Sequence, residues 1–160
     1  MTSPDPVRAG GSAFVDLHTH STASDGSRPP AEVVREAKRI GLAAIALTDH
    51  DTLDGIAEAV ATGDELGVRI VPGVELSAVE GDVETHILGL HLSDTREMET
   101  RLIALRDMRR SRAQRIVARL NELGVRIEFT AVLDQAAGGA IGRPHVARAM
   151  IAEGGAVDFR

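Results

Sequence analysis

The residues of this sequence that could do chemistry are histidines and acids that follow short apolar runs. His18 and His20 come directly after the first run, His50 after the second and Glu75 after the third. Alternate residues of an extended chain project to the same side, so both imidazoles of the His-x-His pair can point at one spot beyond the strand's end. The carboxyl ends of successive strands open onto one crevice in α/β proteins. We therefore expect these side chains to converge on a single site.

Each of these residues also has an ordinary structural explanation when it is taken alone. His50 could be a buried histidine with satisfied hydrogen bonds, Glu75 a surface glutamate, and the flanking Asp49 and Asp51 helix caps. Asp25, in a loop rich in Ser and Gly, could be a turn aspartate. Their shared position at the ends of successive strands favours an active site over these separate explanations.

Two further histidines belong to one predicted strand. His86 starts this apolar stretch and His91 lies five residues further on, so the two face opposite sides of an extended chain. We expect His86 to be a metal ligand that points into the site, and His91 to be an ordinary strand histidine.

A possible anion-binding motif, Gly-Arg-Pro-His, opens the last predicted helix. Arg143 has the planar donors that bind phosphate oxygens, and His145 beside a helix N-terminus can add a donor to the same anion. The alternative is a helix entry with an incidental Arg and His. A second basic stretch is expected to be a solvated helix face, with a patch that faces phosphate or nucleic acid as the alternative. It contains Arg106, Arg109, Arg110, Arg112 and Arg115.

Composition excludes several classes of protein. The chain has 160 residues and a formal net charge of −6, with no Cys, Trp or Tyr, and is 43% hydrophobic. These values predict one globular domain, and any metal in it must be held by His and carboxylate. No apolar run approaches the roughly 18 residues of a membrane helix, so we expect a cytoplasmic protein. The acidic charge and three Phe argue against stable binding of duplex nucleic acid, whereas a small anionic substrate fits.

Strand and helix patterns alternate along the first half of the chain. Residues 1–12 have no periodicity and are expected to form a flexible arm. Uninterrupted apolar strands between helices predict a parallel sheet covered on both faces. The predicted strands are residues 14–17, 43–47, 68–71 running towards Glu75, and 85–92, and the predicted helices between them are 30–40 and 53–66.

Helices dominate the second half. Asp94 and Glu97 resemble a capping box that opens a helix running to residue 123, whose length predicts a kink or a break. A last helix is predicted over 142–152. The core contacts expected from the long helix are Met98, Leu102, Leu105, Ile116, Leu120 and Leu123.

Together these motifs resemble the PHP family, named for polymerase and histidinol phosphatase. The resemblance covers about residues 14–151, and is strongest to the stand-alone phosphoesterases of nucleoside 3′,5′-bisphosphates and of the 5′ ends of short RNA. The motifs are His18-Thr19-His20, Ser24-Asp25-Gly26, Thr48-Asp49-His50-Asp51-Thr52, Pro72-Gly73-Val74-Glu75, His86-Ile87-Leu88-Gly89 and Gly142-Arg143-Pro144-His145.

The resemblance implies a fold and a set of roles. The fold is an α/β, partial distorted (β/α)7 barrel of PHP type, with N-terminal strands and covering helices, over residues 13–160. It also implies two or three divalent metal ions, with Mn favoured and Fe or Zn as alternatives. Arg143 and His145 would contact the substrate phosphate. The implied metal ligands, of which all but the last are also the implied catalytic residues, are His18, His20, Asp25, His50, Glu75 and His86.

The family's remaining ligands, a late His before a Pro and an Asp-x-His, have no counterpart before Arg160. A barrel of this general type usually needs about 250 residues, whereas this chain supplies four or five strands. We therefore expect the chain to be C-terminally incomplete, with an unpaired strand edge.

The expected function is that of a metal-dependent phosphoesterase acting on nucleotides or short oligoribonucleotides. Metal coordination can lower the pKa of a bound water from 15.7 to about 7, and the resulting metal-activated hydroxide could attack the phosphate ester. Asp49 or Asp51 could orient imidazoles. The alternatives are a histidinol-phosphate-type small-molecule phosphatase and a catalytically silent metal-binding module.

Overall fold

The computed structural model describes residues 14–81, 83–93 and 95–158. The arm expected over residues 1–12 and the cap expected at Asp94 lie outside the described residues. In chain order the elements are β1 (Val15–Thr19), α1 (Pro30–Arg39), β2 (Ala44–Leu47), α2 (Ile56–Leu66), β3 (Arg69–Glu80), β4 (Val83–Leu90), α3 (Thr95–Glu122), α4 (Phe129–Ala136) and α5 (Arg143–Ala152).

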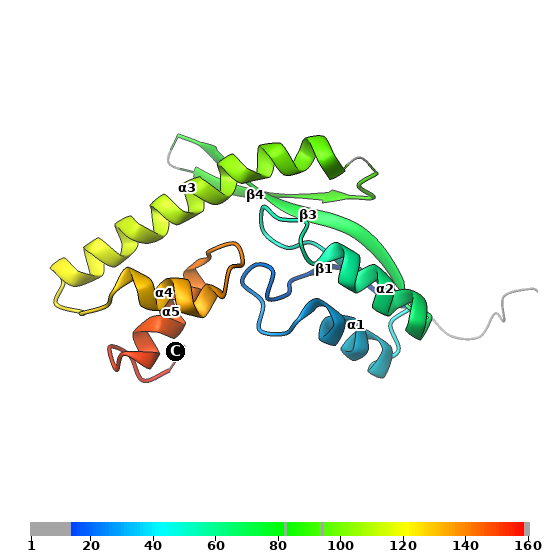
Figure 1. Cartoon of the computed structure of the whole chain (residues 1–160), viewed down its shortest axis with the longest axis horizontal. Helices are drawn as coiled ribbons and strands as arrows, with labels where there is room; N and C mark the ends of the chain where they lie inside the picture. The colour runs from blue at the N-terminus through cyan, green and yellow to red at the C-terminus, as the bar shows by residue number, and fades with distance from the viewer. Residues whose placement is uncertain (1–13, 82, 94, 159–160) are drawn as a thin grey trace, which may run out of the picture.

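The four strands form one mixed sheet in the order β1-β2-β3-β4 (Figure 1). β1 pairs with β2, and β2 with β3, in parallel, which confirms the βαβ pattern of the first half. β4 runs antiparallel to β3, so the expectation of a wholly parallel sheet is wrong for this strand. The physical reason is the length of the connection. Glu80 pairs with Val83, and the two residues between them suit a hairpin but are far too few for a crossover.

Helices α1 and α2 pack on one face of the parallel strands. They form an apolar core with the wholly buried β2, and this core includes Val34, Ala37, Ile45, Leu47, Ala59 and Val68. The sheet is not covered on both faces along its whole width, contrary to expectation. Among the described residues, Val15 of β1 and Ile87 of β4 are about half exposed, at 53% and 52%.

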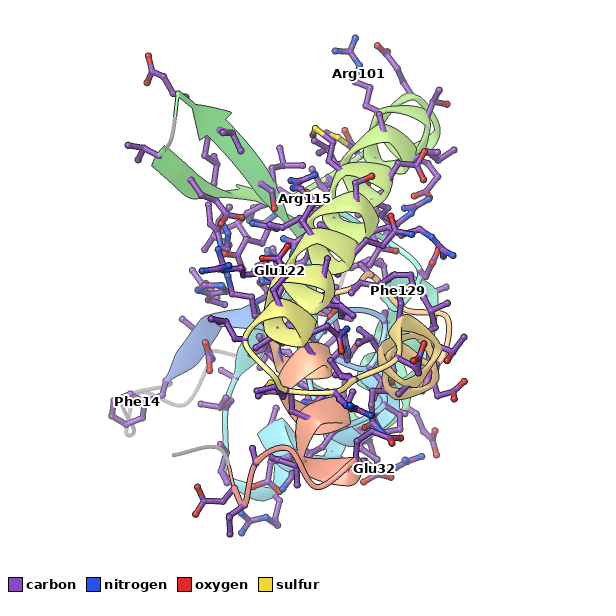
Figure 2. The ribbon with its side chains drawn as sticks, turned by 90° about the vertical axis from the view of Figure 1, so that its left-hand side faces the viewer. Phe14, Glu32, Arg101, Arg115, Glu122 and Phe129 are labelled. Carbon is purple, nitrogen blue, oxygen red and sulfur yellow. The ribbon has the colours of Figure 1, made fainter. Side chains whose placement is uncertain are left out.

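Helix α3 crosses the β3–β4 hairpin and continues beyond the sheet to pack with α4 and α5 (Figure 1). It is one continuous helix of 28 residues, so no break interrupts its described length. Figure 2 shows this helix in full, from Arg101 near one end to Glu122 at the other. Leu102 is buried as expected, whereas Leu123 is 63% exposed because the helix has ended at Glu122.

The second core lies between α3, α4 and α5. Its buried residues are Ala113, Val117, Ile127, Val132, Ala136, Ile141, Val146 and Ala149. Sequence reasoning missed α4, although Phe129, Val132, Leu133 and Ala136 have the spacing of one helical face. Arg110 of α3 lies 5.5 Å from the centre of the Phe129 ring and so ties the two helices together. No helix in the described ranges has both the length and the apolar character that crossing a membrane requires.

Candidate metal centre

The strand ends place the predicted histidines at one edge of the sheet. β1 and β2 finish side by side, with Thr19 paired to Leu47, so that His18, His20 and His50 all lie at this edge. Glu75 lies within β3 and not after it, contrary to expectation, because β3 continues past the edge to pair with β4. It still faces the edge, since His50 pairs with Glu75 in an isolated parallel bridge just beyond the end of β2.

Four imidazoles surround the Glu75 carboxylate. His18 Nε2 lies 2.7 Å and His20 Nε2 2.9 Å from Oε2, and His86 Nδ1 lies 2.6 Å from Oε1. His50 Nδ1 is 3.7 Å from Oε2, beyond hydrogen-bonding distance. The carboxylate is buried at the centre of the group, whereas the His18 side chain is half exposed, so the cluster opens to solvent on the His18 side.

Asp25 completes the cluster on the side away from His86. Its Oδ1 is 3.4 Å from His20 Nδ1, and its Oδ2 is 3.5 Å from His50 Nε2. The structure thus brings together all six residues expected to be ligands. They form three overlapping groups whose ligand atoms lie within 4.8 Å of one another: His18, His20 and Glu75; His20, Asp25 and His50; and His50, Glu75 and His86.

The protonation state of His50 and its unpaired nitrogen suit a metal ligand. Its Nδ1 is buried and, among the described residues, has no hydrogen-bond partner. Burial, together with the Arg109 guanidinium, lowers the pKa of His50 to about 4, so the imidazole is neutral near pH 7 and keeps a free lone pair. A buried polar atom without a partner costs roughly 1–3 kcal/mol, and a cation bound by its lone pair would remove that cost. The donor set and this unpaired nitrogen therefore fit a divalent ion.

The two acids of the cluster are ionised at neutral pH. Burial alone would raise the pKa of Asp25, but its hydrogen bond to His20 and the charges of His50 and His20 lower it to about 2. Burial also opposes ionisation of Glu75, and there too the neighbouring histidines lower the pKa. Both carboxylates thus carry the charge that a bound cation requires.

Asp49 holds the loop that carries Asp25. Its carboxylate accepts hydrogen bonds from the backbone N–H of Ser21 at 2.7 Å and from the hydroxyls of Ser21 and Ser24 at 2.6 Å each. The Ser24 hydroxyl also lies 3.4 Å from His20 Nδ1, so Asp49 is linked to this imidazole through Ser24. The expectation that Asp49 or Asp51 orients imidazoles stays a prediction. Ser21 and Ser24 were missed because nothing local in the sequence shows that Asp49 lies beside them.

Three of the five arginines expected on a solvated face of α3 are buried or half-buried, whereas Arg110 and Arg115 are exposed as expected. Arg109 is 4% exposed and donates to the fully buried Asp51 and to the Ser77 hydroxyl. Arg106 donates to the backbone carbonyl of Asp51, and Arg112 donates to Glu84. The cause is the path of α3 across the β3–β4 hairpin, which turns these arginines towards carboxylates on the site's side of the sheet.

Arg143 is linked through Glu84 to His86, which lies at the edge of the cluster. Its Nη2 donates to Glu84 Oε2 at 2.7 Å, while Glu84 Oε1 accepts from Arg112 and lies 3.3 Å from His86 Nε2. Burial alone would raise the pKa of Glu84, but its hydrogen bonds with Arg112, Arg143 and His86 lower this pKa to about 2. Sequence reasoning missed Glu84 and the role of Arg112. The available signal was the two-residue spacing of Glu84 and His86, which places both on one face of a strand.

His145 lies in the interior and not at the mouth of the cluster. It is 2% exposed, and its Nδ1 accepts a hydrogen bond from the Gly142 N–H at 2.9 Å, which caps the start of α5. Burial, with the nearby Arg148, lowers its pKa. His91 lies just past the end of β4, exposed and with a φ of 57°, and joins none of the three groups. The expected binding of phosphate by Arg143 and His145 stays a prediction.

Comparison with known proteins gives consistent matches. Residues 16–128 match the PHP domain. The chain is 37% identical over 139 residues to the 5′-3′ exoribonuclease Rnm of Escherichia coli, covering 85% of this chain and 47% of that protein. It is 35% identical over 150 residues to the 3′,5′-nucleoside bisphosphate phosphatase of Chromobacterium violaceum, covering 92% and 53%.

Solved structures agree in fold. A structure described as a metal-dependent phosphoesterase from Bifidobacterium adolescentis matches with a TM-score of 0.82 and 32% identity, over 92% of this chain and 52% of that one. An amidohydrolase from Chromobacterium violaceum, solved with bound sulfate, matches with a TM-score of 0.83 and 34% identity, over 91% and 52%. The chain thus spans about half the length of the relatives that it matches.

Proposed function

The chain belongs to the PHP domain family, and from this premise we propose that it carries the metal centre of a phosphoesterase that hydrolyses phosphate esters of nucleotides or short oligoribonucleotides. The observation that carries the proposal is the convergence of four imidazoles and two ionised carboxylates into three overlapping ligand groups. One group would serve one ion, whereas overlapping groups suit two or three ions that share ligands. The mixed nitrogen and oxygen donors fit Mn, Fe or Zn, and of these we propose Mn, as the family resemblance implies.

The six clustered residues would hold the metal. A divalent cation supplies Lewis acidity, which neutralises phosphoryl oxygens and lowers the pKa of water. The ionised Asp25 and Glu75 supply the negative charge that retains it, and His50 supplies a neutral nitrogen that stays deprotonated near pH 7. The ligands are His18, His20, Asp25, His50, Glu75 and His86.

Arg143 is the group best placed to bind the phosphate of a substrate. Its side chain is 66% exposed, and only Nη2 is engaged by Glu84 among the described residues, so its other donors remain available. Arg112, which lies on α3, donates a hydrogen bond to the same Glu84 carboxylate. Glu84 therefore positions both guanidiniums beside His86, where they can neutralise charge that develops on phosphoryl oxygens.

The substrate class follows from the relatives and from this charge pattern. Relatives that are 37% and 35% identical to the chain over the matched residues are named as an exoribonuclease and as a nucleoside bisphosphate phosphatase. Both names denote action on phosphate esters of nucleotides, and a metal cluster flanked by arginines suits such anionic substrates. We therefore propose a phosphorylated small molecule or a short RNA as the partner of this site.

The direct test is elemental analysis followed by assays of the hydrolysis products. Protein purified with Mn²⁺, Fe²⁺ or Zn²⁺ should retain at least two ions per chain. The loaded protein should release phosphate from adenosine 3′,5′-bisphosphate, or mononucleotides from a short 5′-phosphorylated oligoribonucleotide, and faster than it releases phosphate from histidinol phosphate. Protein that retains no stoichiometric metal and hydrolyses none of these substrates would contradict the proposal.

A matched pair of variants tests the assignment of the ligands. His50→Ala removes the imidazole that belongs to two of the ligand groups, and should lower bound metal by at least one ion per chain and abolish turnover. His91→Ala changes an exposed histidine outside all three groups, and should leave both quantities within twofold of the parent. Mass spectrometry of bound metal and phosphate assays measure the two outcomes. Equal losses in both variants would show that the cluster is not the metal site.

A further inference from the structure

The metal centre continues along one face of the β3–β4 hairpin. Residues two apart on a strand share a face, and directly paired residues of antiparallel strands lie on the same face. Two runs therefore lie on one face: Glu75, Ser77 and Val79 of β3, and their partners Leu88, His86 and Glu84 of β4. The face that presents the ligands Glu75 and His86 thus extends without interruption to Val79 and Glu84.

A cavity of about 510 Å³ lies between this extension and α3. We call it the α3 groove. Its size falls within the range of small-molecule sites. Its lining includes Ser77, Val79 and Glu84 from the hairpin and Leu105, Met108 and Arg112 from α3. Because Glu84 also contacts Arg143 and lies 3.3 Å from His86, the groove opens directly beside the metal centre.

The lining changes character along the groove. Next to the metal centre it is polar, with Ser77, Glu84 and Arg112. Elsewhere it offers the exposed apolar side chains of Val79 and Met108, which are 65% and 54% exposed, and the half-buried Leu105. Single exposed apolar residues are ordinary, but here they line one cavity next to a polar site.

The guanidiniums and apolar side chains of the lining suit an aromatic part of a ligand. Of the charged residues that line the groove, Arg109 is paired with the buried Asp51 and Glu84 with Arg112 and Arg143, whereas Arg115 and Asp107 are exposed. Guanidinium planes and apolar side chains are surfaces on which nucleobases stack and pack. Inorganic phosphate alone would use none of the apolar wall.

We propose that the α3 groove binds the nucleoside part of a nucleotide whose phosphate lies at the metal centre. The inference rests on the proposed function and adds the place where the organic part of the substrate lies. Val79 and Met108 contact the base or sugar from opposite walls, and Arg112 lies where the nucleoside joins its phosphate. These three residues would then decide between a nucleotide and a smaller phosphate ester.

Binding measurements test this proposal without relying on turnover. Isothermal titration calorimetry measures the Kd of adenosine monophosphate and of inorganic phosphate for the Mn²⁺-loaded chain. Met108→Trp and Val79→Trp fill the groove from α3 and from β3. The matched control is Ile103→Trp, because Ile103 lies on the same helix, is 50% exposed and does not line the groove. The preference for the nucleotide is the Kd of phosphate divided by the Kd of adenosine monophosphate. This ratio should fall at least tenfold in both groove variants and less than twofold in the control.

Each result of these titrations either supports or overturns the proposed nucleoside site. If the parent binds adenosine monophosphate no more tightly than phosphate, or if the groove variants behave like Ile103→Trp, the groove does not bind the nucleoside. If the chain retains no metal, the proposed function fails, and the same nucleotide titration of the metal-free chain still tests the groove. In that case, no measurable nucleotide binding would overturn the proposal.

Discussion

The histidines of this chain differ chiefly in what surrounds them. His50 is buried beside the Arg109 cation, and its pKa falls to about 4. Burial would also lower the pKa of His20, but Asp25, Glu75 and Asp49 face it, and the net shift is upward. His145 is buried near Arg148, and its pKa is lowered. At the scale of single residues, therefore, neighbouring charge decides which imidazole is a neutral donor and which can carry a proton.

The buried His145 predicts a pH dependence of stability. Its folded-state pKa is below the ordinary value of 6.5, so as the pH falls the unfolded chain takes up this proton first, and stability falls below about pH 6.5. His145→Asn keeps an acceptor for the Gly142 N–H but does not titrate. Between pH 7.5 and 5.5 the metal-free variant should therefore lose less free energy of unfolding than the parent, as measured by urea denaturation.

The control for this experiment is His91→Asn, at an exposed histidine outside the cluster. It should keep the pH dependence of the parent protein. Identical pH dependence in His145→Asn and the parent would show that His145 does not resist protonation in the folded chain.

Among the elements, α3 has two roles. Its Arg109 reaches between the strands to Asp51, whose other oxygen accepts the Ser77 N–H at 2.9 Å. The backbone N–H of Asp51 donates to the Glu75 carbonyl at 3.0 Å, so the ion pair is joined to the segment that presents His50 and Glu75. Asp51 also has a φ of 51°, a conformation that a non-glycine residue keeps only where its surroundings impose it. The helix thus both covers the hairpin and holds the candidate metal centre in place.

Breaking the buried pair should be costly. Arg109→Met leaves the fully buried Asp51 without its cation, and should lower the free energy of unfolding by about 3–5 kcal/mol, measured by urea denaturation. The double variant Asp51→Asn with Arg109→Met removes the stranded charge and should recover part of this loss.

A surface pair on the same helix is the control for Arg109→Met. Arg101 and Glu97 are each 75% exposed, so Arg101→Met should change stability by less than about 1 kcal/mol. If Arg109→Met cost no more than Arg101→Met, the buried pair would not anchor α3 to the strands.

In the molecule as a whole, two apolar cores meet at the loop that carries Asp25. Ala140 N–H donates to the Ala23 carbonyl at 2.9 Å, and Arg148 Nη2 donates to the Asp25 carbonyl at 3.0 Å. Gly139 allows this approach, since a Cβ there would lie 2.6 Å from the Thr22 carbonyl oxygen. The C-terminal helices therefore position a candidate ligand that belongs to the N-terminal half.

Gly139→Ala should force these two parts of the molecule apart. Because the added methyl would collide with backbone atoms, we expect a loss of about 1–3 kcal/mol in unfolding free energy and weaker metal binding, measured by urea denaturation and by metal titration.

Gly89→Ala is the matched control. A Cβ at Gly89 lies 3.4 Å from the nearest atom, a side-chain carbon of Val74, and should cost much less than one at Gly139. Similar losses in both variants would show that the approach of the two halves does not require glycine at residue 139.

Local pattern was enough to predict much of this molecule. The apolar runs and the helix stops predicted β1, β2, α1, α2 and α5 to within about three residues of their observed bounds. The same runs indicated which histidines and acids share an edge, because the direction of a strand and the spacing of its side chains follow from the chain itself. The antiparallel course of β4 escaped prediction because the third strand was expected to end near Glu75, whereas β3 continues to Glu80 and leaves only two residues before β4.

Sequence alone determined which side chains could form a metal centre, because strand ends and two-residue spacing are local properties of the chain. Only the tertiary structure decided what supports that centre. Arg109 and Asp51 lie 58 residues apart, and Arg143 and Glu84 lie 59 apart, yet each pair is in contact. These contacts follow from the path of α3 and the docking of α5. Both depend on how the two cores pack, and no short segment of the sequence encodes that.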